Sequence, residues 1–462
     1  MSDLQKELNS ASNIEYELFL NELTEETIRK ISADQNEPQW MLDHRLASFA
    51  IFKSKKLPNR GPDLSKLDFG KIVWYAKPKK DGPGYARDRN DVPADLKEKF
   101  EKLGIPQAER EYLAGAGGQM DSNTVYHKLK EQREQKGVIF EDMAEAVTKH
   151  EALVRRYFMK LVPNHDHLFA ALHGAVWSGG TFIYVPKGIK MTQPLQAYFR
   201  MNTYGGGQFE HTLIVVEDDA QADYIEGCSA PKFDTPSLHA GMVEVYVGKN
   251  AKMKYSSVEN WSFNTYNLNT KRALVDDDGY MEWVGGNMGS CTTMLYPCTI
   301  LKGERSKTDI LGVAVAGQNQ VQDVGGKVIH IGKHTSSKIV SKSIAKDGGS
   351  AIYRGLVQIM PSAENAHNAT ECDALLMDDL STSSAVPSID VQNDTAVVAH
   401  EASAGKIDEK QLFYLMSRGI DEDKALSMIV NGFFSSIVKK LPLEYASEVN
   451  KLIEMEMEGS VG

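Results

Sequence analysis

Two short stretches of the chain carry the side chains best suited to chemistry. The first, NAHNATECDALLMDD (365–379), contains Cys372, with His367 five residues before it and acidic residues on both sides. The second, VVAHEASAGK (397–406), contains His400 and Glu401. A thiolate, an imidazole and a carboxylate together can form a metal or cluster site. These residues are therefore one candidate site, with a small buried core cysteine as the alternative interpretation of Cys372.

The other cysteines do not form a recognisable ligand motif. The chain has four cysteines and no C-x-x-C, and Cys291 and Cys298 are separated by six residues, a spacing that fits no common zinc or ferredoxin site. Any cluster would need mixed ligands, or ligands from a second subunit. Four cysteines in 462 residues also do not make a disulfide framework, so we expect free thiols in a reducing, cytoplasmic compartment.

Composition excludes several classes of function. The formal net charge of −11 argues against a broad basic face for nucleic acid or anionic lipid. No apolar run is long enough to span a bilayer, and the N-terminal residues show no export signal. We therefore expect no nucleic-acid partner and no membrane association.

A nucleotide site is also not expected. The segment most similar to a P-loop is GGKVIHIGKHTSS (325–337), in which Lys327 replaces a required glycine and His334 replaces the Ser or Thr that coordinates magnesium. The chain is therefore predicted to have no ATPase activity of its own, and not to be an enzyme.

Three regions must position these side chains. Residues 1–165 are predicted to form a mixed, largely helical N-terminal domain. From about 166 to 402 the sequence changes to short β-branched runs interrupted by Gly, Asn and Asp. Residues 403–462 have helical periodicity again and are predicted to form a C-terminal helical domain.

An internal repeat defines the middle region. The segments VEDDAQADY (216–224), VGKNAKMKY (247–255) and VDDDGYMEW (275–283) share one pattern, and AKDGGSAIY (345–353) is a weaker copy. Their spacing of about 30 residues is typical of stacked β-coils, each of which buries its apolar face only against its neighbours. We predict a mainly β fold with a parallel β-helix core, with a β-sandwich or barrel as the alternative.

The repeat register places several candidate residues together. Cys228, Glu259 and Asn287 each lie four residues after the aromatic residue of their repeat, so we expect them to be neighbours on adjacent coils. Cys372 and Glu401 are 29 residues apart, within the range of the repeat, and are likewise expected to stack on one face.

The C-terminal region predicts a helix from Asp408, as its cap, to Gly419, and a second helix over 421–441. A last helix is expected from Pro442. One face of the second helix is predicted to be apolar, and it could cover the end of the solenoid or bind a partner; it consists of Ala425, Met428, Ile429, Gly432, Phe433 and Ile437.

Five long stretches are similar to one protein family: 168–190, 196–217, 224–245, 371–377 and 399–420. On these stretches the chain resembles the SufB/SufD family of iron–sulfur cluster assembly proteins, and within it the SufB scaffold subunit of the SUF system. The resemblance covers nearly the whole chain. It implies a right-handed parallel β-helix between helical end domains.

The resemblance also implies roles for individual residues. Cys372 matches the cysteine that holds the nascent cluster or its sulfur, and Glu401 matches a further proposed ligand, with His400 beside it. Cys228 matches the cysteine that accepts persulfide sulfur. The positions implied to line a sulfur route through the β-helix are Arg200, Asn202, Trp261 and Lys271.

Two departures from the family pattern concern this chemistry. Ala399 stands where well-studied members have Glu, and Glu259 stands where they have Gln. A carboxylate in a sulfur route would repel thiolates, so Glu259 makes the route less secure in this chain.

The resemblance implies partners and cofactors as well. A SufC-type ABC ATPase would dock on the C-terminal helices, a SufD-type paralogue or a second copy of the chain would complete the scaffold, and a cysteine desulfurase or sulfur carrier would deliver sulfur. A transient iron–sulfur cluster and a reduced flavin are the implied cofactors. The alternatives are a SufD-like structural paralogue without cluster chemistry, a pure interaction scaffold, and a β-helix carbohydrate-active enzyme.

Overall fold

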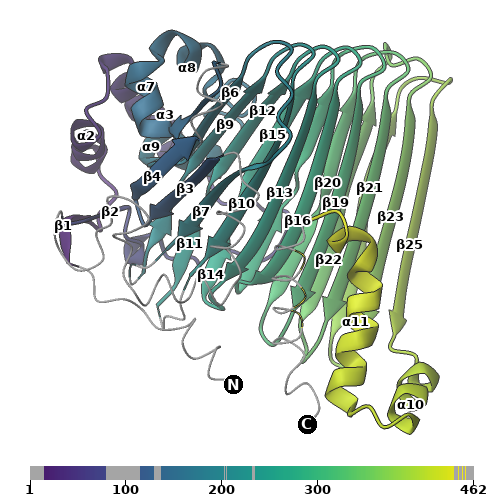
Figure 1. Ribbon diagram of the computed structural model, residues 1–462. Helices are drawn as coiled ribbons and strands as arrows, with labels where there is room; N and C mark the ends of the chain where they lie inside the picture. Colours follow the sequence, from purple (N-terminus) through teal and green to yellow (C-terminus); the bar gives the residue numbers. More distant parts are fainter. Residues whose placement is uncertain are drawn as a thin grey trace.

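The computed structural model describes residues 15–79, 115–129, 137–230 without 202 and 204, and 235–441, with the isolated positions 446, 450 and 453. This part of the chain is mainly β and forms a parallel β-solenoid of about 8 turns, with 7 helices mostly toward the termini. Figure 1 shows the strands side by side, with helices at both ends of the stack. The predicted mainly β fold with a parallel β-helix core is confirmed.

Two sheets face each other across the solenoid interior. The first sheet carries both Cys228 and Cys372, and its parallel strands, in spatial order, are β7 (Leu195–Arg200), β10 (Gln221–Ser229), β13 (Lys252–Trp261), β16 (Tyr280–Gly289), β19 (Lys307–Ala316), β21 (Ser336–Ala345), β23 (His367–Leu376) and β25 (Val397–Lys406). The main parallel strands of the second sheet are β6 (Thr181–Val185), β9 (His211–Val216), β12 (Met242–Val247), β15 (Thr270–Val275), β18 (Cys298–Leu301), β20 (Val321–His330), β22 (Ser350–Ile359) and β24 (Thr382–Val391). The short strands β8 (Gly207–Gln208), β11 (Ser237–His239), β14 (Thr265–Asn267) and β17 (Thr292–Leu295) also belong to the second sheet.

The sequence repeat corresponds to the turn that opens each strand of the first sheet. Asp219, Asn250 and Asp278 have φ of 60°, 52° and 56°, a left-handed conformation that Asp and Asn tolerate better than most residues. Each turn is followed by an alternating strand, as the repeat predicts.

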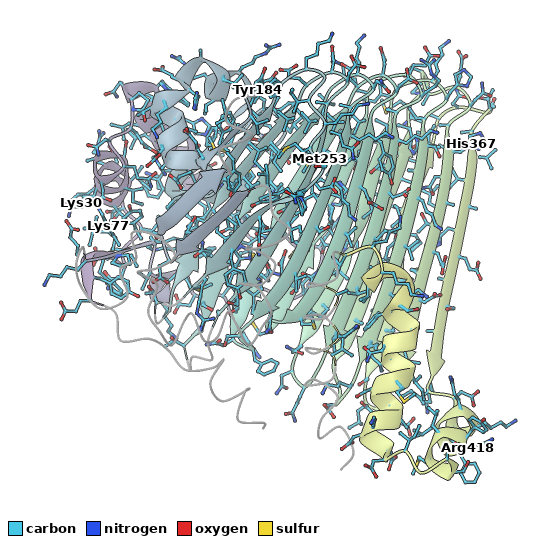
Figure 2. The ribbon with its side chains drawn as sticks, in the orientation of Figure 1. Lys30, Lys77, Tyr184, Met253, His367 and Arg418 are labelled. Carbon is cyan, nitrogen blue, oxygen red and sulfur yellow. The ribbon has the colours of Figure 1, made fainter. Side chains whose placement is uncertain are left out.

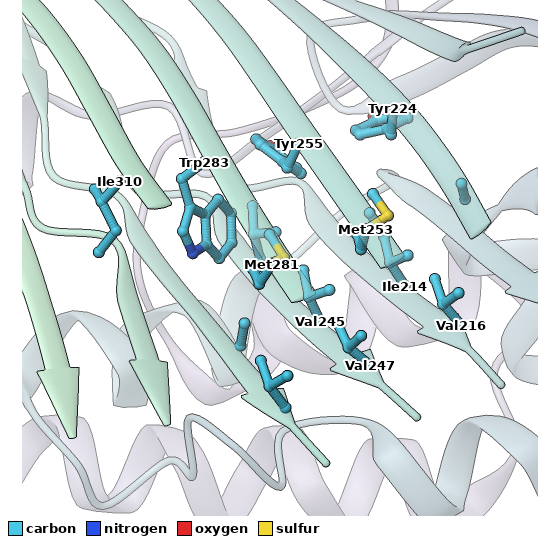
Figure 3. Close-up of a cluster of buried hydrophobic side chains, with 14 of the residues drawn as sticks. Ile214, Val216, Tyr224, Val245, Val247, Met253, Tyr255, Met281, Trp283 and Ile310 are labelled. Atoms are coloured by element: carbon cyan, nitrogen blue, oxygen red, sulfur yellow. The ribbon is translucent and has the colours of Figure 1, made fainter. Parts of the chain in front are cut away.

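The aromatic residues of the repeat stack inside the solenoid. Tyr224 pairs with Tyr255 and Tyr255 with Trp283 in the strand register, with ring centroids 5.4 and 5.0 Å apart. Figure 3 shows this row beside Ile310, with Val245 and Val247 of the second sheet nearby. Because side chains alternate along a strand, every second residue of β10, β13 and β16 points into this core.

The N-terminal region contributes to both sheets. Its described helices are α2 (Glu25–Asp34), α3 (Gln39–Ser54), the short 3₁₀ helix η1 (Phe69–Lys71), α7 (Met143–Lys149), α8 (Glu151–Tyr157) and, after the predicted boundary at 165, α9 (Leu168–Val176). Strand β1 (Tyr16–Leu20) pairs with β2 (Tyr75–Pro78). Strand β3 (Gly115–Met120), which pairs with β4 (Asn123–Leu129), also joins β7, and β5 (Ile139–Asp142) joins β6. Figure 2 shows Lys30 and Lys77 at this end of the molecule and His367 at the other.

The C-terminal region follows β25 directly. The Asp408 side chain caps α10 (Glu409–Ser417) by accepting from the Lys410 amide, and Gly419, with φ of 80°, lies just after that helix, as expected. Helix α11 (Glu422–Val438) packs on the outer face of the first sheet (Figure 1). The helix expected from Pro442 lies almost entirely outside the described residues.

The apolar face predicted for α11 is partly wrong. Met428 is 47% exposed and Gly432 is also exposed. The residues of α11 that are buried are Ala425, Leu426, Val430, Phe434, Ile437 and Val438. The helix has apolar residues around much of its circumference, so its sequence alone did not determine which side the sheet would cover. None of the helices in the described ranges is long and apolar enough to cross a membrane.

Candidate functional site

Cys372 and His400 face each other at the last coil of the solenoid. Cys372 lies on β23 and belongs to the buried core between the sheets. His400 lies on the neighbouring strand β25, where it pairs with Thr370, so its side chain is on the same face as that of Cys372. The Cys372 Sγ and His400 Nε2 are 3.6 Å apart. Tyr353 of β22 stacks against the imidazole, with ring centroids 6.0 Å apart, and so supports its orientation.

The expectation that the Cys372 and Glu401 side chains stack on one face is wrong. In the register of β23 and β25, Cys372 pairs with Ala402, whereas Glu401 pairs with Glu371. Successive side chains of a strand point to opposite faces, so this difference of one residue turns the Glu401 carboxylate away from the sulfur. What reaches Cys372 is the Glu401 backbone carbonyl, which accepts from Sγ at 3.5 Å.

The Cys372 thiol is protonated at neutral pH in this environment. Burial, and then the charge of Asp373, raise its pKa to about 11. Asp373 is itself held by Lys342 at 3.2 Å and by the Ser403 hydroxyl. Because a metal ion binds the thiolate, loading the sulfur with iron would release a proton.

Cys228 lies in the same core cluster as Cys372 but in a far more acidic chamber. The predicted ladder is confirmed, because Cys228 pairs with Glu259 and Glu259 with Asn287. Cys228 Sγ lies 4.0 Å from the Glu226 carboxylate. Lys271 enters from the second sheet, and its Nζ lies 2.9 Å from Glu259 and 3.8 Å from Glu226.

Further polar groups close the chamber. His239 Nε2 lies 2.5 Å from the Glu210 carboxylate, and Asn267 donates to Glu259 at 2.7 Å. The Trp261 indole donates to Glu259 at 3.4 Å. Glu210, Glu226 and His239 were missed from the sequence. Of these, Glu226 could have been predicted from the sequence, because it lies two residues before Cys228 in a strand and its side chain must therefore be on the same face.

The carboxylates of the chamber outnumber its lysine and hold it by charge. Burial lowers the pKa of Lys271, but Glu259, Glu226 and Cys228 together raise it above its usual value. Burial raises the pKa of the Cys228 thiol well above its usual value, and Glu226, Glu259 and Glu210 raise it further. The lysine ammonium is therefore engaged by carboxylates, and Cys228 remains a thiol.

Of the other two residues predicted to line a sulfur route, Arg200 lies near Cys228 and Asn202 is not described. Arg200, at the end of β7, is buried and donates from Nη1 to the Ser229 hydroxyl at 3.0 Å. Ser229 is adjacent to Cys228 in sequence. Asn202 lies outside the described residues.

A small cavity of ≈ 30 Å³ lies between the two cysteine sites. It is lined by Ser257 and Lys271 on one side and by Ser341 on the other, and Ser341 pairs with Cys372. Gly285 and Gly312 line the cavity between these two sides and have no side chain to fill it. A Cβ placed on Gly312 would meet nothing within 4 Å. The cavity is large enough for roughly one or two water-sized groups at a time.

Comparison with known proteins matches this chain over most of its length. The model of the SUF system FeS cluster assembly SufBD core domain matches residues 199–433, and that of the SufBD protein N-terminal region matches residues 118–197. The chain belongs to the SufBD family. This SufBD protein is 50% identical over 440 residues to an iron-sulfur cluster assembly SufBD family protein of Staphylococcus aureus (strain MRSA252), covering 95% of this chain and 94% of that protein. A SufBD family protein of Staphylococcus saprophyticus shows the same identity and coverage.

The core-domain match includes both cysteine sites. Among the described residues, no three His, Cys, Asp or Glu side chains are grouped so that they could hold a metal ion. At Cys372 the described side chains bring together one thiol and one imidazole, that of His400.

Proposed function

We propose that this SufBD protein is a SufB-type scaffold on which an iron–sulfur cluster is assembled from iron and persulfide sulfur and then passed to acceptor proteins. The observation that carries the proposal is the Cys372–His400 pair, a soft sulfur and an imidazole 3.6 Å apart. Both are ligand types that bind iron in mixed clusters. A SufD-like paralogue would lend a histidine without the cysteine, so the pair favours the SufB-type role.

The last coil also supports a second scaffold half. Strands β24 and β25 lie at the ends of their sheets, with no further described strand beside them. Ile389 and Val391 are 49% and 45% exposed, although they pair with the core residues Val357 and Ile359. A SufD-type paralogue or a second copy of this chain would cover these residues and could supply further cluster ligands, with Glu401 available at its edge.

The exposed face of α10 supports docking of a SufC-type ATPase. None of the α10 residues is buried, and Phe413 and Tyr414 are 73% and 55% exposed. Exposed aromatic residues of this kind are common anchors of protein interfaces. The ATPase would supply the nucleotide chemistry for which this chain is predicted to have no site, so the chain itself is an assembly scaffold and not an enzyme.

The interior supports a sulfur route only in part. Cys228 and Cys372 face one interior and a cavity lies between them, which favours a relay from a desulfurase or sulfur carrier. The carboxylates around Cys228 raise its pKa and occupy Lys271, which opposes formation of a thiolate or persulfide anion. The reduced flavin remains a prediction, with no described residue assigned to it.

The carbohydrate-enzyme alternative is less well supported. Glycoside hydrolysis needs two carboxyl groups that reach a sugar in an open cleft. Glu226 and Glu259 are a close carboxylate pair in this chain, but both are buried and held by Lys271 inside the solenoid.

The test is anaerobic reconstitution of the full chain with iron and sulfide, followed by absorbance. We expect Cys372→Ser to lose the cluster while its circular dichroism remains native, because such a swap costs only about 1–3 kcal/mol of stability. Cys291→Ser is the matched control and should form the cluster normally. Normal cluster assembly by Cys372→Ser would show that Cys372 is only a packing residue of the core. If the unmodified chain formed no cluster under any condition, a SufD-like or purely structural role would be favoured.

A further inference from the structure

A second and larger cavity, of ≈ 510 Å³, lies against the outer face of the second sheet. It is bounded by residues that follow α3, by the start of α9 and by side chains of β15, β18 and β20. Its volume is within the usual range for small-molecule sites. The residues that line it include Lys55, Lys56, Phe169, Arg272, Tyr296 and Lys327.

Three side chains form a ladder on the floor of this cavity. Arg272 pairs with Cys298, and Cys298 pairs with Lys327, on three successive parallel strands. Adjacent strands lie about 4.8 Å apart, so the thiol has a cation on each side. Lys271, next to Arg272 in sequence, sends its ammonium into the interior chamber instead, so the floor and the Cys228 site are on opposite faces of β15.

Asp166 offsets part of the positive charge of the cavity, because it pairs with Arg272 and also acts electrostatically on Lys327. None of the lining residues is Asp or Glu, and Lys55, Lys56 and Lys327 form no salt bridge with a described residue. Arg272 is fixed by Asp166 and by the Leu161 carbonyl, each at 2.7 Å. On a chain of net charge −11, a concentration of lysines in a recess is a local exception that favours an anionic ligand.

Lys327 is the cation best placed to meet that ligand. Its Nζ lies 4.7 Å from the centroid of the Tyr296 ring, on which the half-buried side chain rests. Burial lowers the pKa of Lys327. A bound anion would oppose that effect and stabilise the charged lysine.

The remaining wall is apolar and partly aromatic. Leu168 and Phe169 at the start of α9 face the cavity, together with Leu268, Met294 and Tyr296. Leu168, Phe169 and Leu268 are already buried in a core cluster. The apolar surface left for a ligand is therefore mainly that of the half-buried Met294 and Tyr296. A ligand with a flat organic body would cover it and place its anionic group on the lysines.

We propose that this cavity binds a phosphorylated small molecule with an aromatic body, its phosphate held by Lys327 and the two lysines that follow α3. A dianion suits several lysines better than a single carboxylate does, and lysine is a common phosphate ligand. The site lies on the opposite side of the second sheet from the Cys228 chamber and does not depend on the proposed cluster assembly.

Pyridoxal 5′-phosphate is a suitable probe, because it is an aromatic phosphate whose aldehyde condenses with a lysine amine to form an imine and water. Borohydride then reduces the imine to a stable amine that peptide mass spectrometry can locate. We expect sub-stoichiometric probe to label Lys327, Lys55 or Lys56 on the full chain, and excess inorganic pyrophosphate to suppress the label. Pyridoxal, which lacks the phosphate, should show no preference for these lysines.

The quantitative test is a titration of the probe by absorbance. Lys327→Gln should raise the apparent Kd by about tenfold, the usual effect of losing one charged hydrogen bond. Lys338→Gln removes an exposed lysine of β21 and is the matched control, for which we expect no change. Label spread over exposed lysines, no protection by pyrophosphate, or an unchanged Kd for Lys327→Gln would each overturn the proposal.

Discussion

At the scale of single residues, the two inward-facing cysteines have opposite surroundings. Cys372 has an imidazole within 3.6 Å and the charge of one aspartate near it, and burial is the main cause of its raised pKa. Cys228 is surrounded by carboxylates whose charges add to the effect of burial. A metal ion can displace the proton of the first thiol with the help of the imidazole, whereas the second must lose its proton against nearby negative charge.

The proposed sulfur relay gives a direct prediction for Cys228, although the carboxylates around this thiol oppose the relay. Cys228→Ala should fail to build a cluster when a desulfurase supplies sulfur, yet build one from free sulfide, which can reach Cys372 without the relay. The measurement is cluster absorbance with each sulfur source on the same preparation. Equal yields from both sources would make Cys228 a packing residue of the core.

The residues that the sequence predicted well are those fixed by the repeat. Cys228, Glu259 and Asn287 share one position in consecutive repeats, and the register aligns them. Glu401 was misplaced because no repeat marker lies between Cys372 and Glu401, and the coil there is one residue longer than the 29-residue spacing assumed. An error of one residue inverts the face of a strand, so spacing alone could not settle that pair.

At the scale of elements, the interior faces of β16 and β19 determine whether anything can move between the two sites. Cys228 and Cys372 are five strand-to-strand steps apart in the first sheet, or roughly 24 Å at the usual strand spacing. Sulfur cannot cross that distance in one step. The glycines at 285 and 312 are where the core is not filled by side chains.

Filling that space should therefore separate the two sites. Gly312→Val places a branched side chain where a Cβ meets nothing within 4 Å, and we expect stability to change by no more than about 1 kcal/mol, because β-branched residues suit a strand. Cluster formation with the desulfurase should fall strongly, while formation from free sulfide stays near normal. An unchanged desulfurase-driven rate would mean that sulfur does not pass this coil.

In the C-terminal region, the sequence pattern predicted where the helices begin and end better than it predicted which side of α11 is buried. The cap at Asp408 and the stop at Gly419 are local signals, and both are found where expected. The buried side of α11 depends on contacts with Val313 and Val340 of distant strands, which a helical pattern does not contain. Met428 was assigned to the buried face but is exposed, and is available to a partner together with α10.

Substitution on α10 should separate docking from folding. Phe413 is 73% exposed, so Phe413→Ser should leave thermal unfolding unchanged but weaken capture of a SufC-type ATPase by about tenfold, the typical loss for an aromatic anchor. Lys252→Ser, at an exposed position of β13, is the control. If the Phe413 variant bound the ATPase as well as the unmodified chain does, α10 would not be part of the docking interface.

At the scale of the whole molecule, the two ends of the solenoid differ. Helices and the β3–β4 pair accompany the N-terminal coils, whereas β24 and β25 end their sheets at the other side (Figure 1). Unpaired edge strands with exposed apolar side chains readily pair with another chain. The Cys372–His400 pair lies on these last coils, so a partner that covers the end would also enclose the proposed cluster site.

A single charge at this end should therefore affect assembly and chemistry together. Ile389 pairs with the buried Val357 but is 49% exposed, so Ile389→Lys can place its ammonium in solvent with little cost to the fold. We expect complexes isolated from cells that also express the SUF partners to lose the second scaffold half, as measured by light scattering, and to hold less cluster. ATPase capture by α10 should persist, because that helix lies outside the sheets. If Ile389→Lys assembled and loaded clusters normally, the second half would have to bind elsewhere, and Cys372 and His400 would have to complete their ligand set within one chain.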